Sequence, residues 1–120
     1  MRTVATKKFD QWTEKQGVSV DDLKEAADEL ANGLYEADLG GHLFKKRVGV
    51  GNIGKRGGVR TIICFERDKK TIFIQGFAKN EQANITKKEL KAFKLLAKIF
   101  LAMSEKEFET AIKNGDFVEL

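Results

Sequence analysis

The sequence lacks proline altogether and has a single cysteine and a single histidine among its 120 residues. The absence of proline argues against Pro-rich linkers and stalks. One cysteine, Cys64, cannot form an internal disulfide, and with His42 alone beside it the chain has too few ligands for a usual structural zinc site. We therefore expect a protein that functions without a disulfide, a metal or another cofactor.

Long hydrophobic runs are also missing. No apolar stretch approaches the roughly 20 residues that cross a bilayer, and the first residues, MRTVATKKFDQW, do not resemble a signal peptide. Hydrophobic residues make up 42% of the chain, which is ordinary for a globular protein and argues against disorder. We expect a single domain over residues 1–120, located in the cytoplasm and without a membrane partner.

Acidic residues are absent between Gly40 and Phe65, whereas basic residues and glycines are concentrated there. The basic residues of this segment are Lys45, Lys46, Arg47, Lys55, Arg56 and Arg60. Glycine lets backbone amides approach a ligand closely, so the segment is a candidate anion site. The alternative is a solvated basic face with no ligand. Residues 14–38 are predominantly acidic and would repel a polyanion.

The sequence GVGNIGKR at residues 49–56 matches both GxGxxG and GxxxxGK. In nucleotide-binding proteins such a loop opens into a helix, and its final hydroxyl holds magnesium. Here Arg56 stands in place of the Ser or Thr, and Gly57 and Gly58 lead into a predicted strand. We therefore predict that this motif does not bind a nucleotide.

Capping residues and hydrophobic spacing predict three helices. Ser19 caps the first, whose apolar positions are Leu23, Ala26, Ala27, Leu30 and Leu34. Thr86 with Glu89, and Ser104 with Glu107, form capping boxes that begin two more, the last ending near Gly115. The helix that begins at Thr86 carries a stripe of lysines away from its apolar face, formed by Lys87, Lys91, Lys94 and Lys98.

Residues 43–50, 59–65 and 71–77 are rich in β-branched and aromatic residues and predict three strands of an antiparallel meander. Residues 116–120 are a tail or an edge strand, and the segment before Ser19 is compatible with strand or helix. These elements predict an α+β fold in which helices flank a small antiparallel sheet.

Basic residues on neighbouring strands suit phosphodiester chemistry. Cleaving RNA without a metal requires a proton to leave the 2′-hydroxyl, charge to be stabilised on the phosphorus centre, and the leaving oxygen to be protonated. Arginine serves only the second need, whereas a lysine crowded by arginines has a lowered pKa and can carry protons. We expect Lys55 and Lys79 to be the proton carriers. A surface that holds phosphate without chemistry is the alternative.

The segments LFKKRVGVGNIGKRGGVRTIICF and TIFIQGFAKNEQANITKKELKAFKLLAK contain the patterns KxGGxR and FAKNE. This sequence resembles the RelE/ParE superfamily of bacterial type II toxins, in particular its RelE- and HigB-like branch. The resemblance implies an mRNA interferase, an endoribonuclease that cuts mRNA in the ribosomal A site and inhibits translation. It also implies three partners, which are the ribosome, mRNA and a cognate antitoxin, often a helix-turn-helix DNA-binding protein.

Carried over by position, the resemblance implies that the scissile phosphate is gripped by Arg47, Lys55, Arg56, Arg60 and Lys79. Of these we expect Arg47, Lys55, Arg60 and Lys79 to be catalytic. We expect Lys45, Lys46, Arg56 and Phe77 to bind RNA. Many ribosome-dependent members have a tyrosine or histidine near the C-terminal strand, where this chain has Phe77, which can stack but cannot move a proton. Two other functions are compatible with the sequence, a non-catalytic ParE-like toxin acting on DNA gyrase and an inactive relic that binds RNA or antitoxin.

Overall fold

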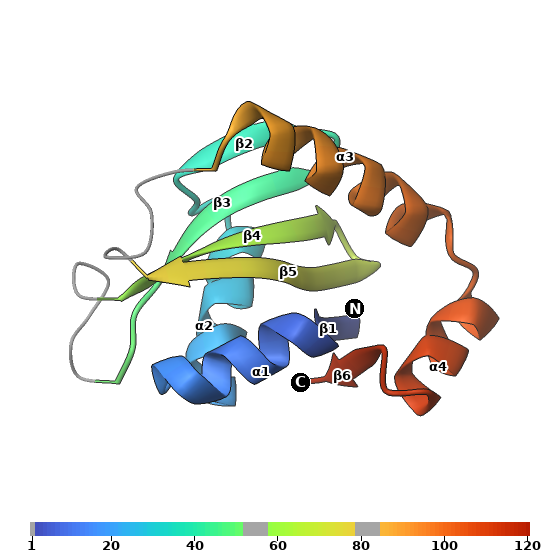
Figure 1. The fold of residues 1–120 in the computed structure, drawn as a ribbon, viewed down its shortest axis with the longest axis horizontal. Helices are drawn as coiled ribbons and strands as arrows, with labels where there is room; N and C mark the ends of the chain where they lie inside the picture. The colour runs from blue at the N-terminus through green and yellow to red at the C-terminus, as the bar shows by residue number, and fades with distance from the viewer. Residues whose placement is uncertain (1, 52–57, 79–84) are drawn as a thin grey trace.

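The computed structural model describes residues 2–51, 58–78 and 85–120 of the chain. Six strands form one sheet in the order β2-β3-β4-β5-β1-β6, and α1 and α3 lie on opposite sides of it (Figure 1). The strands are β1 (Arg2–Thr6), β2 (Ala37–Gly40), β3 (Leu43–Val48), β4 (Val59–Glu66), β5 (Lys70–Ala78) and β6 (Phe117–Glu119). The helices are α1 (Lys7–Gln16), α2 (Val20–Ala31), α3 (Lys87–Ala102) and α4 (Glu105–Lys113).

The predicted meander is confirmed, because β3 pairs antiparallel with β4, and β4 with β5. The N-terminal segment contains both a strand and a helix: β1 inserts beside β5, and α1 begins at the cap Thr6. The β1–β5 pair is parallel, so the sheet is mostly rather than wholly antiparallel. The C-terminal segment forms the edge strand β6 next to β1. The α+β class predicted from the sequence is thus confirmed.

Capping residues set the starts of the three predicted helices. Ser19, Thr86 and Ser104 each accept a hydrogen bond from the backbone of the third helical residue, and that residue's carboxylate accepts one from the cap. The inclusion of Leu34 in the first apolar stripe is wrong, because α2 ends at Ala31 and the Leu34 side chain is 55% exposed. Asn32 and Gly33 end the helix before the stripe reaches that position.

Side chains alternate between the two faces of the sheet, and a separate apolar core forms on each. One core joins the sheet to α1 and α2 through residues such as Phe9, Leu23 and Ile63. The other core joins it to α3 and α4 through residues such as Ile62 and Phe108. The side of the sheet covered by α1 and α2 is the α2 face, and the side covered by α3 and α4 is the α3 face.

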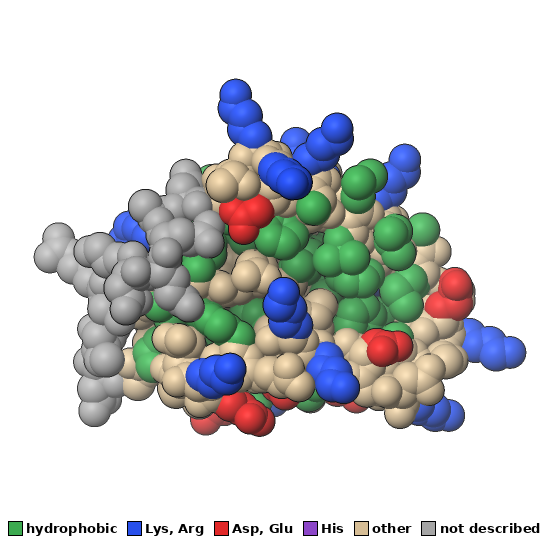
Figure 2. Space-filling view, in the orientation of Figure 1, with side chains coloured by type: hydrophobic (Ala, Val, Ile, Leu, Met, Phe, Trp, Pro, Cys, Tyr) green, Lys and Arg blue, Asp and Glu red, His purple; other side chains and the backbone are tan. Residues whose placement is uncertain are grey.

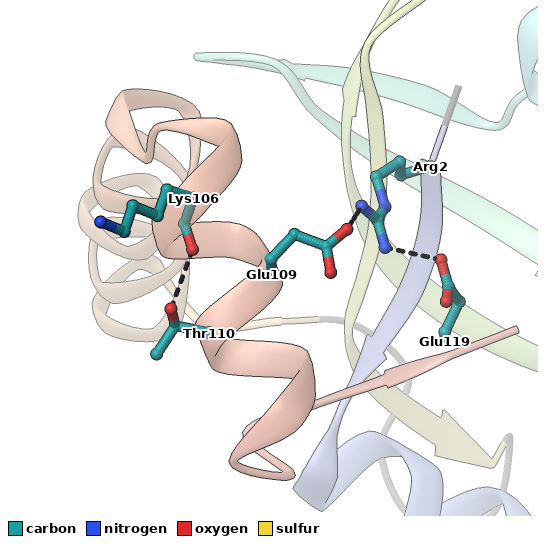
Figure 3. A network of polar contacts seen from close by, with 5 residues as sticks. All are labelled: Arg2, Lys106, Glu109, Thr110 and Glu119. Atoms are coloured by element: carbon teal, nitrogen blue, oxygen red, sulfur yellow. Dashed lines mark hydrogen bonds and ion pairs between the residues drawn. The ribbon is translucent and has the colours of Figure 1, made fainter.

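Polar contacts fasten α3, α4 and the two chain ends to the sheet. The guanidinium of Arg2 in β1 contacts Glu109 of α4 and Glu119 of β6 (Figure 3). The Nζ atom of Lys70, at the start of β5, donates to the carbonyls of Phe100 and Met103 at 3.1 and 2.8 Å. Because a lysine there satisfies carbonyls at the C-terminal end of α3, it fixes where that helix ends over the sheet.

Candidate nucleic-acid interface

Strand β3 presents its basic side chains alternately to the two faces. Leu43 belongs to the α3-face core and Val48 to the α2-face core. Since successive side chains of a strand point to opposite faces, Lys45 and Arg47 lie on the α3 face and Lys46 lies on the α2 face. Of the three basic residues in KKR, two therefore lie on the α3 face and one lies on the α2 face.

Arg60 of β4 lies directly opposite Arg47 of β3, while Lys45 pairs with Ile62. Directly paired side chains have Cβ atoms about 4.5–5.5 Å apart, so like charges in this register destabilise the sheet. Arg60 shares the α3 face with Ile62, two residues further along β4. Lys45, Arg47 and Arg60 thus converge on one face, and we call them the basic triad.

The electrostatics of Lys45 reflect this convergence. Burial lowers the pKa of the Lys45 ammonium, and the positive charges of Arg60 and Arg47 lower it further. The carboxylate of Glu36 acts in the opposite direction. A lysine crowded by arginines was expected at Lys55 or Lys79, and among the described residues this environment is found at Lys45. Such a cluster can hold an anion, and a lysine with a lowered pKa can exchange a proton.

Glu36 is a member of the site that sequence reasoning missed. Its backbone N–H donates to the carbonyl of Lys45 at 2.9 Å, and its carboxylate accepts a hydrogen bond from the backbone N–H of Arg47. In the sequence Glu36 belongs to the acidic segment, and no local signal connects it with β3. The pairing of β2 with β3 brings it beside the basic triad.

Gly58 allows β3 and β4 to approach beside the Arg47–Arg60 pair. A Cβ atom at this position would lie 2.0 Å from the carbonyl oxygen of Val48, an impossible contact. The sequence suggested that glycines here admit a ligand, whereas Gly58 admits the neighbouring strand. Its role is to permit the register that places the two arginines opposite each other.

Lys46 makes a different contact from the one expected. Its side chain is 1% exposed, and its Nζ atom lies 2.9 Å from Oε1 of Glu29 in α2. A buried ammonium paired in this way is directed away from the basic triad. An ammonium held in this buried pair is not available to bind RNA beside the basic triad.

Aromatic residues near the basic triad are not arranged for stacking on a base. Phe77 pairs with Arg60, but it is 3% exposed and packs within the α3-face core. Tyr35 contacts the ring of Phe44 edge-on, with ring centroids 4.9 Å apart. Because Phe44 packs against the α2-face core, this contact places Tyr35 on the face opposite the basic triad.

Lys55, Arg56 and Lys79 lie outside the described residues. The strands that lead to and from their segments end together, since Val48 pairs with Val59 and Val59 with Ala78. This is the end of the sheet at which Arg47 and Arg60 are found. The other two reactive side chains lie elsewhere: His42 is exposed in the β2–β3 turn, and burial raises the pKa of the Cys64 thiol to about 12.

The described helices include none long and apolar enough to cross a membrane. The geometry defines a class, a small α+β protein with helices on both faces of its sheet and a cationic cluster near one end. The family described as "RelE toxin of RelE / RelB toxin-antitoxin system" matches residues 1–120, so the chain belongs to the RelE toxin family. The resemblance seen in the sequence and the expected RelE-like fold are thereby confirmed. A search of curated proteins found no match.

Proposed function

We propose that this RelE-family toxin inhibits translation as a ribosome-dependent, metal-independent mRNA endoribonuclease of the cytoplasm. The observation that supports the proposal is the basic triad, in which Arg47 and Arg60 face each other and both act on Lys45. Placing like charges together costs stability, which is typical of a site built for an anionic ligand. Its partners in this proposal are mRNA, the ribosome and a cognate antitoxin that binds DNA through a helix-turn-helix.

The chemistry requires three tasks. A base takes the proton of the 2′-hydroxyl as its oxygen attacks phosphorus, the extra negative charge is stabilised, and the bond to the 5′-oxygen breaks as an acid protonates that oxygen. Arg47 and Arg60 are suited to the second task because they keep their charge at any working pH. Lys45 joins Lys55 and Lys79 as a candidate proton carrier, and Arg56 is assigned to positioning phosphate.

Replacing Arg60 tests the proposal. The Arg60→Ala variant should remain folded and lose about 10²- to 10³-fold in the rate of ribosome-dependent mRNA cleavage, the usual effect of removing one transition-state donor. Growth arrest on expression should disappear in parallel. Arg67→Ala is the matched control, because Arg67 is exposed in the turn between β4 and β5, at the other end of the sheet.

Pulse labelling during expression separates the alternatives. The proposal expects protein synthesis to stop first while DNA replication continues. Arrested replication with a DNA-damage response would instead indicate a gyrase poison, and a folded wild-type chain that causes no arrest would indicate a relic. Unchanged cleavage by a folded Arg60→Ala variant would remove this arginine from the mechanism.

A further inference from the structure

Helix α3 is rich in apolar residues but buries few of them against the sheet. Of its 16 residues only Ala97 is buried. Leu95 and Ile99 are 59% and 61% exposed, the two most exposed large hydrophobic side chains in the described part of the chain. A monomer gains nothing from two adjacent exposed aliphatic side chains on one helix, so this surface is a candidate interface.

The exposed apolar residues form one continuous row. Ala92, Leu95, Ile99 and Ala102 follow one another at intervals of three, four and three, and all four are exposed. This spacing is that of a seam onto which a second helix packs. Ala97, which is fully buried against the sheet, lies on the opposite side of the helix. We call these four residues the apolar row.

Four lysines flank the apolar row on one side, and Lys88 lies in line with the row at its N-terminal end. At 100° per residue Lys91, Lys94 and Lys98 fall on a single flank of the row, together with Lys87. Within the described residues the ion pairs join Arg2 to Glu109 and Glu119, and Lys46 to Glu29, and none includes a lysine of α3. Basic side chains project along the outer edge of α3 while hydrophobic side chains gather beside and below it (Figure 2).

We infer that the outer surface of α3 is the docking site for an amphipathic helix of the antitoxin. The apolar row would receive the partner's apolar face, and the lysine flank would pair with acidic residues along one edge of the partner. The inference rests on the antitoxin partner of the proposed function, but it does not depend on RNA cleavage.

Charge complementarity favours an acidic protein partner over the other occupants. A second copy of this chain packed antiparallel on the same row would place lysine flank against lysine flank. An RNA strand would use the lysines but leave Leu95 and Ile99 in water. Only a partner that is both apolar and acidic covers the entire surface.

The test measures binding of this chain to the products of the two reading frames beside its gene, by calorimetry with purified proteins. Leu95→Asn/Ile99→Asn should bind the antitoxin at least tenfold more weakly than wild type, with an unchanged circular dichroism spectrum. Leu34→Asn, which replaces an equally exposed leucine away from α3, should bind like wild type. Lys91→Gln/Lys98→Gln should bind about three- to tenfold more weakly, with a reduced dependence on salt.

Several results would overturn the inference. The Leu95/Ile99 double variant could bind within twofold of wild type, or the wild-type chain could bind neither product. The free wild-type chain could also form a dimer that the double variant abolishes. Binding of RNA, but not of antitoxin, that depends on the lysines would also contradict it. Failure of the proposed function has a separate signature, because a chain that cleaves no mRNA can still show the expected antitoxin binding.

Discussion

Lys45 and Lys46 are adjacent and chemically identical, and the fold gives them opposite tasks. Lys45 lies on the α3 face, where burial and then the charges of two neighbouring arginines lower its pKa. Lys46 is buried on the α2 face, where its ammonium pairs with Glu29. A strand turns each successive side chain to the other face, so a single residue step separates a candidate catalytic lysine from a structural one.

Replacing Lys45 with arginine tests its role as a proton carrier. Arginine keeps the positive charge but cannot release a proton, because its pKa exceeds about 12. We expect Lys45→Arg to bind RNA within about twofold of wild type and to cleave about 10²- to 10⁴-fold more slowly. Single-turnover cleavage of ribosome-bound mRNA measures the rate, and a Lys45→Arg rate equal to wild type would exclude this role.

The pH profile provides an independent check on Lys45. A base acts in its neutral form, so a lowered pKa makes that form available at lower pH than in free lysine, and cleavage should rise with pH until that pKa is passed. Glu36→Gln removes the carboxylate that raises the pKa, so the rise should move to lower pH. A shift to higher pH in this variant would contradict the assignment.

At the scale of elements, the Lys46–Glu29 pair fixes α2 against β3. The amphipathic helix α2 buries its apolar side, including Leu23 and Leu30, and turns Asp21, Glu25 and Asp28 outward. Glu29 lies between these two sides, half-buried, where its carboxylate meets the ammonium of Lys46. The pair positions the same strand that carries Lys45 and Arg47, so it supports the basic triad from the opposite face.

Removing Glu29 should therefore be costly. Glu29→Ala leaves the Lys46 ammonium buried without its partner, and we expect the free energy of unfolding to fall by about 3–5 kcal/mol. Replacing both residues, Glu29→Gln with Lys46→Met, should recover most of that loss. Urea denaturation measures each value, with Glu25→Ala as the control on the exposed side of α2 and an expected change within about 0.5 kcal/mol. Equal effects of Glu29→Ala and Glu25→Ala would show that the pair does not hold the helix.

At the scale of the whole molecule, the basic triad and the acids of α2 lie on opposite faces of the sheet. The basic triad and the lysines of α3 lie on the α3 side, whereas acids of α2 line a hollow of about 250 Å³ on the other side, among them Asp22, Glu25 and Glu29. The formal net charge of +4 conceals this division. An approaching polyanion is attracted by the basic triad and repelled by the acids of α2, which favours its approach from the α3 face.

The salt dependence of RNA binding measures this attraction. For single strands the logarithm of the association constant falls with the logarithm of salt concentration by about 0.7 per phosphate neutralised. Arg47→Ala should reduce the magnitude of that slope by about 0.7, while Glu25→Ala on the far side should leave it unchanged. Fluorescence anisotropy with a short labelled RNA gives both slopes, and equal slopes for wild type and Arg47→Ala would place the RNA elsewhere.

By itself the sequence determined the local structure, because the signals are local. Ser19, Thr86 and Ser104 mark helix starts through hydrogen bonds that span only three residues, and all three are confirmed. β-Branched and aromatic residues identified the meander for the same reason. The proximity of Arg47 and Arg60 was also accessible from the sequence, since the two strands that carry them follow each other in the chain and pair.

The tertiary structure decided what depends on contacts between distant segments. The residues next to Lys46 in the sequence do not predict its burial. Its burial depends on which face of the sheet α2 covers and on the position of Glu29 in that helix. The pairing of β2 with β3 brings Glu36 to the site. Strand β1 pairs in parallel with β5, and the paired residues are about 68 positions apart in the sequence. Residue type and spacing record which charges are present, whereas the pairing of strands and the packing of helices decide which of those charges meet.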